Sequence, residues 1–317
     1  MFFTIADAMK VSIPVVELAN RDALPAARPL RVIDLGAGCG AMSLGLIESL
    51  VALATPIALS ITAIDRDAAA LGIAGAAIRE LATVRGLDVS FTPRTEDATT
   101  AKLASADLVV MGTLLNELAA PARQGLVERA LAAIGDDGAV ILIEPALRET
   151  SRALHELRDS ILTSGTGHVF APCTRKIAPC PSLLHTNDWC HEDRTIKLPP
   201  RTRELSRLTH LRDDGMKFSY LVLRKRPLSV VDEPGAWRIV SSPRSPKGKH
   251  EITGCYDPGW VPLRLMRRHR TDANRTFERA DRGDVVVISA PAGEDRVEIV
   301  ADTSAVRVEP AKPRGTI

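Results

Sequence analysis

Three cysteines lie close together in the middle of the chain, and thiol side chains at such spacing could bind a metal centre. Cys173, Cys180 and Cys190 fall within eighteen residues, with prolines directly beside the first two. The prolines exclude a continuous helix or a central strand. An irregular segment of this length needs something to order it, and several thiolates on one centre would do so. A fourth thiol, Cys255, follows sixty-five residues later. If all four meet, the centre joins two parts of the chain.

The cysteine spacing indicates a metal site without specifying the metal. It reads Cys-x6-Cys-x9-Cys, with Cys255 after a further sixty-four residues. This is neither the Cys-x2-Cys pair of common zinc ribbons nor a ferredoxin spacing. A zinc site of three cysteines and one histidine stays open, with His168, His185 or His191 as the fourth ligand, although each could be a surface histidine. Cys39, in a glycine-rich turn, is expected to be a small packing residue.

The second stretch with chemical potential is that glycine-rich turn. Residues 31–35 form a short apolar run that predicts a buried strand, and residues 41–53 predict the helix that follows. Glycines allow the backbone to approach a ligand closely, and a helix N-terminus offers free N–H groups. We therefore expect a nucleotide-type cradle built on Gly36, Gly38 and Gly40.

Two cofactors fit this cradle. Gly-x-Gly-x-x-Ala, ending at Ala41, also satisfies the dinucleotide fingerprint. Asp34 favours S-adenosylmethionine, because a carboxylate at the strand end would repel a pyrophosphate but can anchor an ammonium group. Asp65, at the tip of the second strand, is placed to accept hydrogen bonds from ribose hydroxyls, and Asp67 is expected to cap the next helix. Asp97 lies where an acceptor for the adenine edge would be, although a helix N-cap is an equal alternative.

The elements around this cradle predict an α/β fold. Five strands alternate with helices, which is typical of a doubly wound parallel sheet with helices on both faces. The expected strands are residues 31–35, 57–64, 87–92, 106–112 and 139–143, and residues 217–226 are expected to end the sheet. The expected helices are residues 41–53, 68–84, 117–134 and 146–163.

Asn116 follows the fourth predicted strand. In a doubly wound methyltransferase this position borders the transferred methyl group, because ligands lie beyond the carboxyl ends of the strands. Asn116 could contact a substrate or cap the helix predicted at 117–134, and we favour the cap. The Asn/Asp-Pro-Pro-aromatic motif of base-amino methyltransferases is not found here.

Charge is distributed unevenly along the chain. The 317 residues are 45% hydrophobic and carry a net charge of +2. Residues 1–150 hold 12 basic and 18 acidic side chains, whereas residues 194–275 hold 19 basic and 8 acidic ones. This asymmetry favours a polyanion-binding half, with a solvated basic surface as the alternative. The densest basic patch, suited to phosphates, is Arg264, Arg267, Arg268 and Arg270.

The domain prediction follows these shifts in composition. The lead-in is expected at residues 1–30, the cofactor domain at 31–230 with a cysteine-rich metal-binding insertion at 168–193 (the cysteine segment), a small basic β module at 235–300 and a tail at 301–317. The first residues lack the features of a secretory signal and no long apolar run is found, so we expect a cytoplasmic protein with no membrane partner.

An ordered set of motifs resembles a known family, the methyltransferase-like proteins of small-ribosomal-subunit assembly, whose animal mitochondrial member is methyltransferase-like protein 17. The resemblance covers about residues 31–290. It rests on His168-Val-Phe-Ala-Pro-Cys173, Pro179-Cys180-Pro181, Asp188-Trp189-Cys190-His191, Phe218-Ser219-Tyr220-Leu-Val-Leu, Gly248-Lys-His250 with Cys255, and Arg279-Ala-Asp-Arg-Gly283-Asp284.

The resemblance implies a class I methyltransferase (Rossmann-like) fold that carries a [4Fe–4S] cluster and binds small-subunit ribosomal RNA. Carried over by position, the cluster ligands would be Cys173, Cys180, Cys190 and Cys255. The S-adenosylmethionine site would comprise Asp34, Gly36, Gly38, Gly40 and Asp65. The resemblance leaves enzymatic activity open.

Three hypotheses for function follow. The leading one is a protein that binds S-adenosylmethionine and 16S-type ribosomal RNA, in which an iron–sulfur cluster, or zinc as the alternative, fixes the basic β module. The second is an active methyltransferase on RNA or protein, which lacks an evident catalytic base near Asn116. The third, an NAD-dependent dehydrogenase, requires hydride-handling residues that the sequence does not display.

Overall fold

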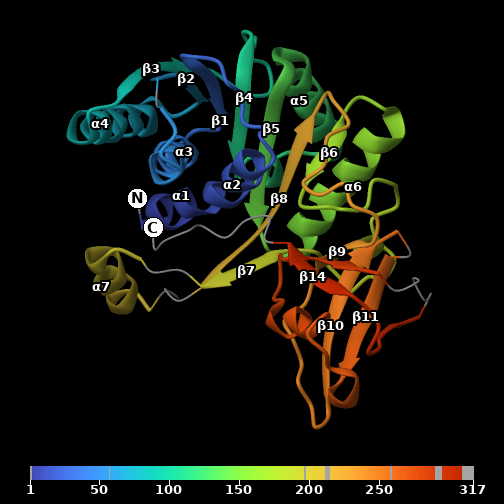
Figure 1. Ribbon diagram of the computed structural model, residues 1–317. Coiled ribbons are helices and arrows are strands. Elements are labelled where there is room, and N and C mark those ends of the chain that lie inside the picture. The colour runs from blue at the N-terminus through green and yellow to red at the C-terminus, as the bar shows by residue number, and fades with distance from the viewer. Residues whose placement is uncertain are drawn as a thin grey trace.

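The computed structural model describes residues 2–56, 58–195, 198–210, 215–257, 259–289 and 295–308. Two sheets organise these residues: an eight-stranded main sheet and a six-stranded sheet formed by the C-terminal part of the chain. The second sheet lies below the main one in Figure 1, and the cysteine segment lies between two strands of the main sheet.

The main sheet has the order β3-β2-β1-β4-β5-β8-β6, with β7 paired to β8 as well. Its strands are β1 (Leu30–Leu35), β2 (Ala58–Asp65), β3 (Asp88–Thr95), β4 (Ala106–Gly112), β5 (Ile134–Pro145), β6 (His168–Ala171), β7 (Glu192–Thr195) and β8 (Gly215–Arg224). The first five strands in this order are parallel, whereas β8 is antiparallel to β5 and β6. This order, with an antiparallel strand inserted next to β5, is that of class I methyltransferases, and it confirms the predicted Rossmann-like α/β sheet.

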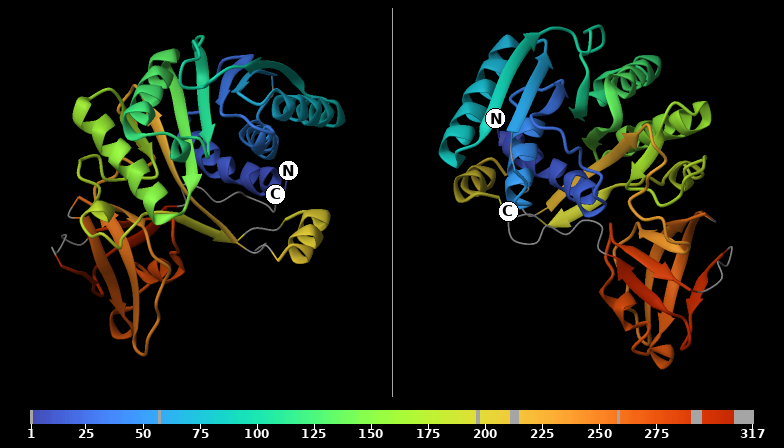
Figure 2. Two further views of the ribbon diagram at one scale, coloured as in Figure 1. Left: turned by 180° about the vertical axis from the view of Figure 1, so that it is seen from behind. Right: turned by 45° about the horizontal axis from the view of Figure 1, so that its top comes forward.

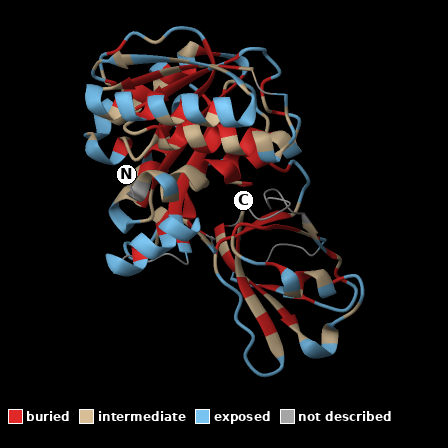
Figure 3. Ribbon diagram, turned by 90° about the vertical axis from the view of Figure 1, so that its left-hand side faces the viewer, coloured by how far each residue is buried: buried red, intermediate tan, exposed pale blue. Residues whose placement is uncertain are grey.

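Helices cover both faces of the main sheet. One face carries α1 (Phe2–Ala8), α2 (Ser12–Asn20), α3 (Ala41–Ala52) and α4 (Ala68–Arg85), and the other carries α5 (Ala120–Ala133) and α6 (Arg148–Ser164). Successive residues of a strand point to opposite faces. Val32 and Ile141 therefore pack with α2 and α3, whereas their neighbours Ile33 and Val140 pack with α5 and α6. Figure 3 shows the sheet buried between helices whose outer faces are exposed.

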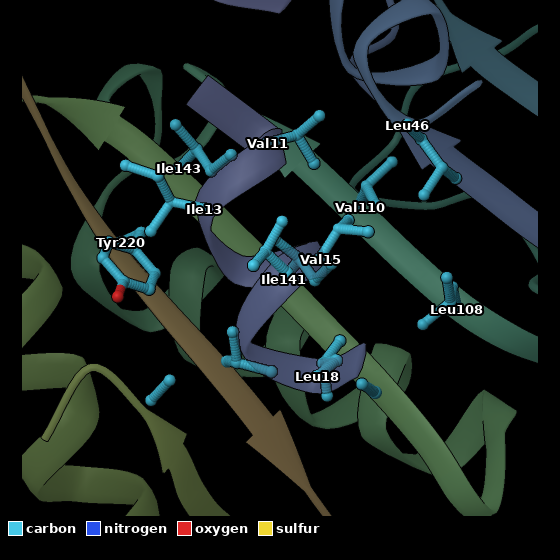
Figure 4. Close-up of a cluster of buried hydrophobic side chains, with 14 of the residues drawn as sticks. Val11, Ile13, Val15, Leu18, Leu46, Leu108, Val110, Ile141, Ile143 and Tyr220 are labelled. Atoms are coloured by element: carbon cyan, nitrogen blue, oxygen red, sulfur yellow. The ribbon is translucent and has the colours of Figure 1, made fainter. Parts of the chain in front are cut away.

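Residues 1–30, predicted as a lead-in, supply helices that complete the core. Pro14 lies in the first turn of α2, where no backbone donor is lost. Val15 and Leu18 are fully buried, and Figure 4 shows α2 lying across β4 and β5 with Val15 close to Ile141. The chain upstream of the glycine turn is thus part of the main domain.

The second sheet forms the β module, in the order β13-β11-β10-β9-β12-β14. Its strands are β9 (Ala236–Ile239), β10 (Lys249–Tyr256), β11 (Gly259–Met266), β12 (Val285–Ile288), β13 (Val297–Ile299) and β14 (Ala305–Val308). Trp237 and Phe277 fill its core. β14 corrects the prediction of a tail from residue 301, because it pairs with β12 along its whole length and buries Ala305.

Helix α7 (Pro200–Leu208) stands apart from both sheets, as the views in Figures 1 and 2 agree. It follows β7 along the chain, and its apolar residues Leu205 and Leu208 are exposed. Among the helices of the described residues, none combines the length and apolar character needed to cross a membrane.

Candidate functional site

The glycine cradle, residues 36–40, joins β1 to α3. Gly36, Gly38 and Gly40 all have positive φ angles, of 67°, 50° and 85°. Two of them also lie against neighbours: a Cβ atom at Gly36 would be 2.9 Å from Leu114 Cδ1, and one at Gly40 would be 2.9 Å from Ala74 Cβ. The turn thus requires glycine for both conformation and space. Cys39 is partly exposed in this turn.

Asp34 lies at the end of β1 beneath the cradle and is fully buried. Its Oδ2 accepts hydrogen bonds from the backbone N–H and the Oγ–H of Ser43, at 3.2 and 2.6 Å. Its Oδ1 is buried without a partner among the described residues. Desolvation raises the pKa of Asp34 to about 6, against the hydrogen bonds from Ser43. An unpaired buried carboxylate oxygen at this place fits the ammonium group of S-adenosylmethionine.

Asp65 ties the cradle to the tip of β2. Its Oδ2 accepts a hydrogen bond from Gly38 N at 2.8 Å, and its Oδ1 accepts one from Asp67 N at 2.9 Å. A carboxylate has further lone pairs, so Asp65 can still accept from a ribose hydroxyl. Asp67 caps α4 by accepting from Ala69 N and Ala70 N, which confirms the predicted cap.

Asp97 is exposed and holds a turn after β3. Its Oδ1 accepts hydrogen bonds from the backbone N–H and the hydroxyl of Thr99, at 2.7 and 2.6 Å. No helix begins at this position in the described chain, so the alternative interpretation as a helix N-cap is wrong. Contact with an adenine edge stays a prediction.

Asn116 does not cap a helix, which corrects the interpretation we favoured. It lies in a 3₁₀ turn at residues 115–117, and α5 begins only at Ala120. The hydrogen-bond pattern assigns the orientation of its amide: with the nitrogen facing Glu144, it donates to Glu144 Oε2 at 3.2 Å and to Thr113 O at 2.8 Å. The exposed loop after β4 is thereby fastened to the end of β5.

Glu144 is a buried acid at the carboxyl end of β5 that sequence reasoning missed. Its oxygens accept the backbone N–H groups of Leu115 at 2.8 Å and Asn116 at 3.2 Å. Desolvation raises the pKa of Glu144 to about 7, although these hydrogen bonds oppose the shift. Its position just after a predicted strand, beside Pro145, is the feature of the sequence that could have indicated a site residue.

The four cysteines named from the sequence line one cavity, which we call the thiol cavity. Cys173, Cys180 and Cys190 come from the cysteine segment, and Cys255 comes from β10 of the β module. The structure thus brings together thiols that are up to eighty-two residues apart in sequence, counted from Cys173 to Cys255. Within the described ranges, no three His, Cys, Asp or Glu side chains form a group that could hold a metal ion.

Burial dominates the chemistry of these thiols. Desolvation raises the pKa of all four, and the increase is largest for Cys255. The guanidinium of Arg158 opposes this effect at Cys173, Cys180 and Cys255. Cysteines bind metals as thiolates, which carry negative charge. Four thiols with buried arginines beside them therefore fit a centre of several metal atoms that is negatively charged as a whole.

The histidines fall in different places. His191 lines the thiol cavity and stacks on Trp189, with 5.6 Å between ring centroids. His185 is exposed, and His168 begins β6 with partial exposure. Sequence reasoning missed His155 of α6, which also lines the cavity.

Helix α6 orders the cysteine segment through one face. Arg152 Nη1 donates to the carbonyl oxygens of Ser182, His185 and Asp188, at 2.8, 2.8 and 2.9 Å. Arg158 Nη2 donates to Arg175 O at 2.8 Å. The spacing of three residues from Arg152 to His155 to Arg158, which places side chains on one helical face, was the signal in the sequence.

The β module contacts the cysteine segment through polar groups. Arg238 Nε donates to Pro172 O at 2.6 Å, and Thr174 Oγ1 donates to Cys255 O at 3.3 Å. Arg282 Nη1 donates to His191 O at 3.2 Å. These bonds hold the module against the segment at residues that line the thiol cavity.

The predicted RNA-binding arginines differ in how far they are engaged within the module. Arg264, on β11, forms ion pairs with Glu251 at 2.8 Å and Glu298 at 3.4 Å. Arg270 pairs with Glu278 at 2.7 Å. Arg267 and Arg268 are exposed on a 3₁₀ turn at residues 267–269. The patch is therefore weaker than four free charges, and its contact with RNA stays a prediction.

Comparisons with solved structures give distant likenesses to methyltransferases. The magnesium protoporphyrin IX methyltransferase ChlM from Synechocystis PCC 6803, solved with bound S-adenosylmethionine, is 14% identical, with 70% of this chain and 81% of that chain covered and a TM-score of 0.40. A TehB-like S-adenosylmethionine-dependent methyltransferase from Corynebacterium glutamicum is 17% identical, with 49% and 73% covered and a TM-score of 0.33. The fold is assigned from the strand order of the main sheet.

Comparison with protein families gives a match over most of the chain, whereas no curated protein matches it. Residues 9–287 match the family described as mitochondrial small ribosomal subunit Rsm22. The match spans the glycine cradle, the cysteine segment and most of the β module. The chain belongs to the Rsm22 family.

Proposed function

We propose that this chain binds S-adenosylmethionine, carries a [4Fe–4S] cluster and acts on the small ribosomal subunit by binding its 16S-type RNA in assembly or translation. The observation that carries this proposal is the thiol cavity, in which cysteines of the main domain meet Cys255 of the basic module. The printed family description, which names the mitochondrial small ribosomal subunit, supports the partner. Because that description names mitochondria, a cytoplasmic location stays a prediction.

Cys173, Cys180, Cys190 and Cys255 would hold the cluster. A [4Fe–4S] cluster takes one thiolate on each iron, so thiols distributed around a cavity suit it. When bound, the cluster would supply a covalent link between the cysteine segment and β10. The chain's own residues then position the β module through Arg238, Thr174 and Arg282, which bond across the same boundary.

Metal and sulfide analysis of protein purified without oxygen tests the cluster. We expect about four irons and four sulfides per chain. Cys255→Ser should lose the cluster, whereas Cys39→Ser, outside the thiol cavity, should retain it. A result of one zinc per chain and no iron would identify the site as a zinc site instead. A chain without any metal would contradict the proposal.

Asp34 and Asp65 support S-adenosylmethionine as the ligand of the glycine cradle. The unpaired Oδ1 of Asp34 can accept from an ammonium group, which NAD does not offer there. Calorimetric titration should detect S-adenosylmethionine binding, with NAD as the competing ligand. Asp34→Asn should weaken binding at least tenfold, since a buried charge-assisted hydrogen bond is lost. Binding of NAD alone would favour the dehydrogenase instead.

The β module supports RNA binding through its exposed arginines. Phosphate contacts by Lys and Arg make affinity fall steeply with salt. The double variant Arg267→Gln/Arg268→Gln should reduce the slope of log affinity against log salt by about 2 on 16S-type RNA. The control Arg79→Gln/Arg85→Gln removes two exposed charges from α4 and should leave the slope unchanged. Equal slopes for both double variants would place the RNA elsewhere.

A second candidate, an active methyltransferase, is favoured by Glu144. Its pKa of about 7 and its position at the carboxyl end of β5, bonded to Asn116, suit a proton acceptor near the methyl group. The sulfonium of the cofactor drives transfer, and the protein mainly positions the nucleophile. Transfer of labelled methyl groups to immature small subunits, reduced by Glu144→Gln, would support this candidate. Binding without turnover would favour the first.

A further inference from the structure

Two arginines at the thiol cavity each have a buried Nε–H group that lacks a hydrogen-bond partner among the described residues. The side chain of Arg158 also lies within hydrogen-bond reach of Cys173, one of the four thiols. Arg158, on α6, and Arg175, in the cysteine segment, both line the cavity. Their side chains are almost fully buried, with 1% and 9% of the residue surface exposed. The Nε of each has no hydrogen-bond partner among the described residues. Buried donors are rarely left unpaired, because such a group loses its hydrogen bonds to water without gaining others.

The remaining groups of the two side chains are fixed by the protein. Arg158 Nη2 donates to Arg175 O at 2.8 Å and to Ile177 O at 3.2 Å, and its Nη1 pairs with Asp159 at 2.5 Å. Arg175 Nη1 donates to Tyr256 O and Asp257 O, which are both in the β module. Each guanidinium is therefore held in one orientation, and its Nε–H group is the donor that has no partner.

The charge of Arg175 points to a negatively charged occupant. Arg158 has Asp159 as its carboxylate partner, whereas Arg175 forms no ion pair with a residue that the structure describes. A buried cation without a counter-charge is costly. Both the unpaired charge and the unpaired Nε of Arg175 belong to a side chain that borders four thiols. A cluster with four thiolate ligands carries negative charge on its sulfur atoms.

We propose that Arg158 and Arg175 donate hydrogen bonds to the sulfur atoms of the iron–sulfur cluster and thereby set its reduction potential and its lifetime in air. This inference rests on the proposed cluster. Hydrogen bonds to the sulfurs and local charge are known determinants of the potential of such clusters. The two donors stabilise the more negative, reduced state, so they raise the potential. They come from α6 and from the cysteine segment, and Arg175 also bonds to the β module, so the potential depends on all three parts being docked.

Potentiometric titration of the intact holoprotein, followed by its visible absorption, tests this role. Arg175→Gln removes charge and donors, and Arg175→Lys keeps the charge but removes the guanidinium edge. We expect the midpoint potential to shift to more negative values in both variants, further in Arg175→Gln, and absorbance to be lost faster in air. Arg158→Lys should shift the potential in the same direction.

The matched control is Arg152→Lys. Arg152 lies on the same face of α6 and bonds to carbonyl groups of the same segment, but it does not line the thiol cavity. This variant should bind less cluster at an unchanged potential. Full occupancy of Arg175→Gln and Arg175→Lys at the wild-type potential and lifetime would overturn the inference and leave the cluster proposal intact. Wild-type protein without iron and sulfide would overturn both.

Discussion

Glu17 of α2 and Arg238 of β9 form an ion pair at 2.7 Å across 221 residues of sequence, and both side chains are buried. Tyr220 of β8 donates to the other carboxylate oxygen of Glu17 at 2.7 Å. Arg238 also donates to Pro172 O of the cysteine segment. The N-terminal helices, the main sheet, the cysteine segment and the β module therefore meet at one buried polar cluster. Because Arg238 lines the thiol cavity, this cluster also supports the candidate metal site.

Breaking this pair should be costly. Removing one partner of a buried pair leaves the other charge uncompensated, typically at about 3–5 kcal/mol. We expect Glu17→Gln to lower the free energy of unfolding by about this amount in urea titrations. The double variant Glu17→Leu/Arg238→Met should lose less than the sum of the single changes, because no lone charge remains. The exposed ion pair between Arg226 and Asp137 provides the control, because Asp137→Asn should change the free energy of unfolding little. Additive losses would mean that the two side chains act independently.

Asp34 should make stability depend on pH. Its ordinary pKa is 3.8, and burial raises the pKa to about 6 in the folded protein. The unfolded chain therefore releases this proton first, and the contribution of Asp34 to stability falls as pH rises from about 4 to about 6. Asp34→Asn should remove this fall and raise the free energy of unfolding of the ligand-free protein at pH 7 by about 3 kcal/mol. Urea titrations from pH 4 to pH 8 check it.

The exposed carboxylate Asp88 provides the comparison for this titration. Asp88→Asn should leave the profile of the wild type unchanged. An unchanged profile in Asp34→Asn as well would mean that Asp34 is ionised and compensated within the folded protein.

Gly45 sets how closely α1 approaches α3. A Cβ atom at Gly45 would overlap the carbonyl oxygen of Ala8, and it would also lie 2.7 Å from Val11 Cγ1. Gly45→Ala should therefore displace α1 and lower the free energy of unfolding by about 1–3 kcal/mol. Gly72, in the second turn of α4, has nothing within 4 Å of its Cβ position. Gly72→Ala should stabilise the protein by about 0.5–1 kcal/mol, and equal effects of the two changes would contradict the packing of α1.

Arg152 should keep the second half of the cysteine segment closed. Its guanidinium donates to four carbonyl groups between Ser182 and Asp188. In Arg152→Ala the backbone N–H groups of residues 182–188 should exchange hydrogen at least tenfold faster, because this loop loses the guanidinium that bonds to four of its carbonyl groups. Arg85 of α4 pairs with Glu48 of α3, outside this segment, so Arg85→Ala should leave this exchange unchanged. Identical protection in both variants would show that the thiols or the β module order the loop without Arg152.

Local patterns sufficed for most of the main sheet. The strand, glycine turn and helix around residues 31–53 and the Asp67 cap depend on neighbouring residues, and both were predictable. Asn116 was misread because Pro121, in the first turn of α5, sets the start of that helix later than the apolar pattern suggests.

Long-range partners were beyond the reach of such patterns. Glu17 in an amphipathic helix looks like a surface residue until Arg238 is placed beside it. β14 is four residues long and is ordered by pairing with β12, so the sequence of residues 305–308 does not by itself predict a strand. The cysteine residues were predictable from type and spacing, whereas the arginines that order them act through backbone carbonyl groups, which no motif records.

The cysteine segment leaves the main sheet from β6 and returns to it at β7, and both short strands pair with β8, which is made later. During synthesis, neither strand has its partner until residues 215–224 have left the ribosome. The fourth thiol emerges some thirty residues later still, at Cys255. Three of the thiols thus lie in a stretch of nascent chain that has no strand partner, whereas all residues of the glycine cradle have already been synthesised. We therefore expect newly made molecules to be more open to oxidation and proteolysis in this interval, and we expect a metal centre that uses Cys255 to be loaded only after it.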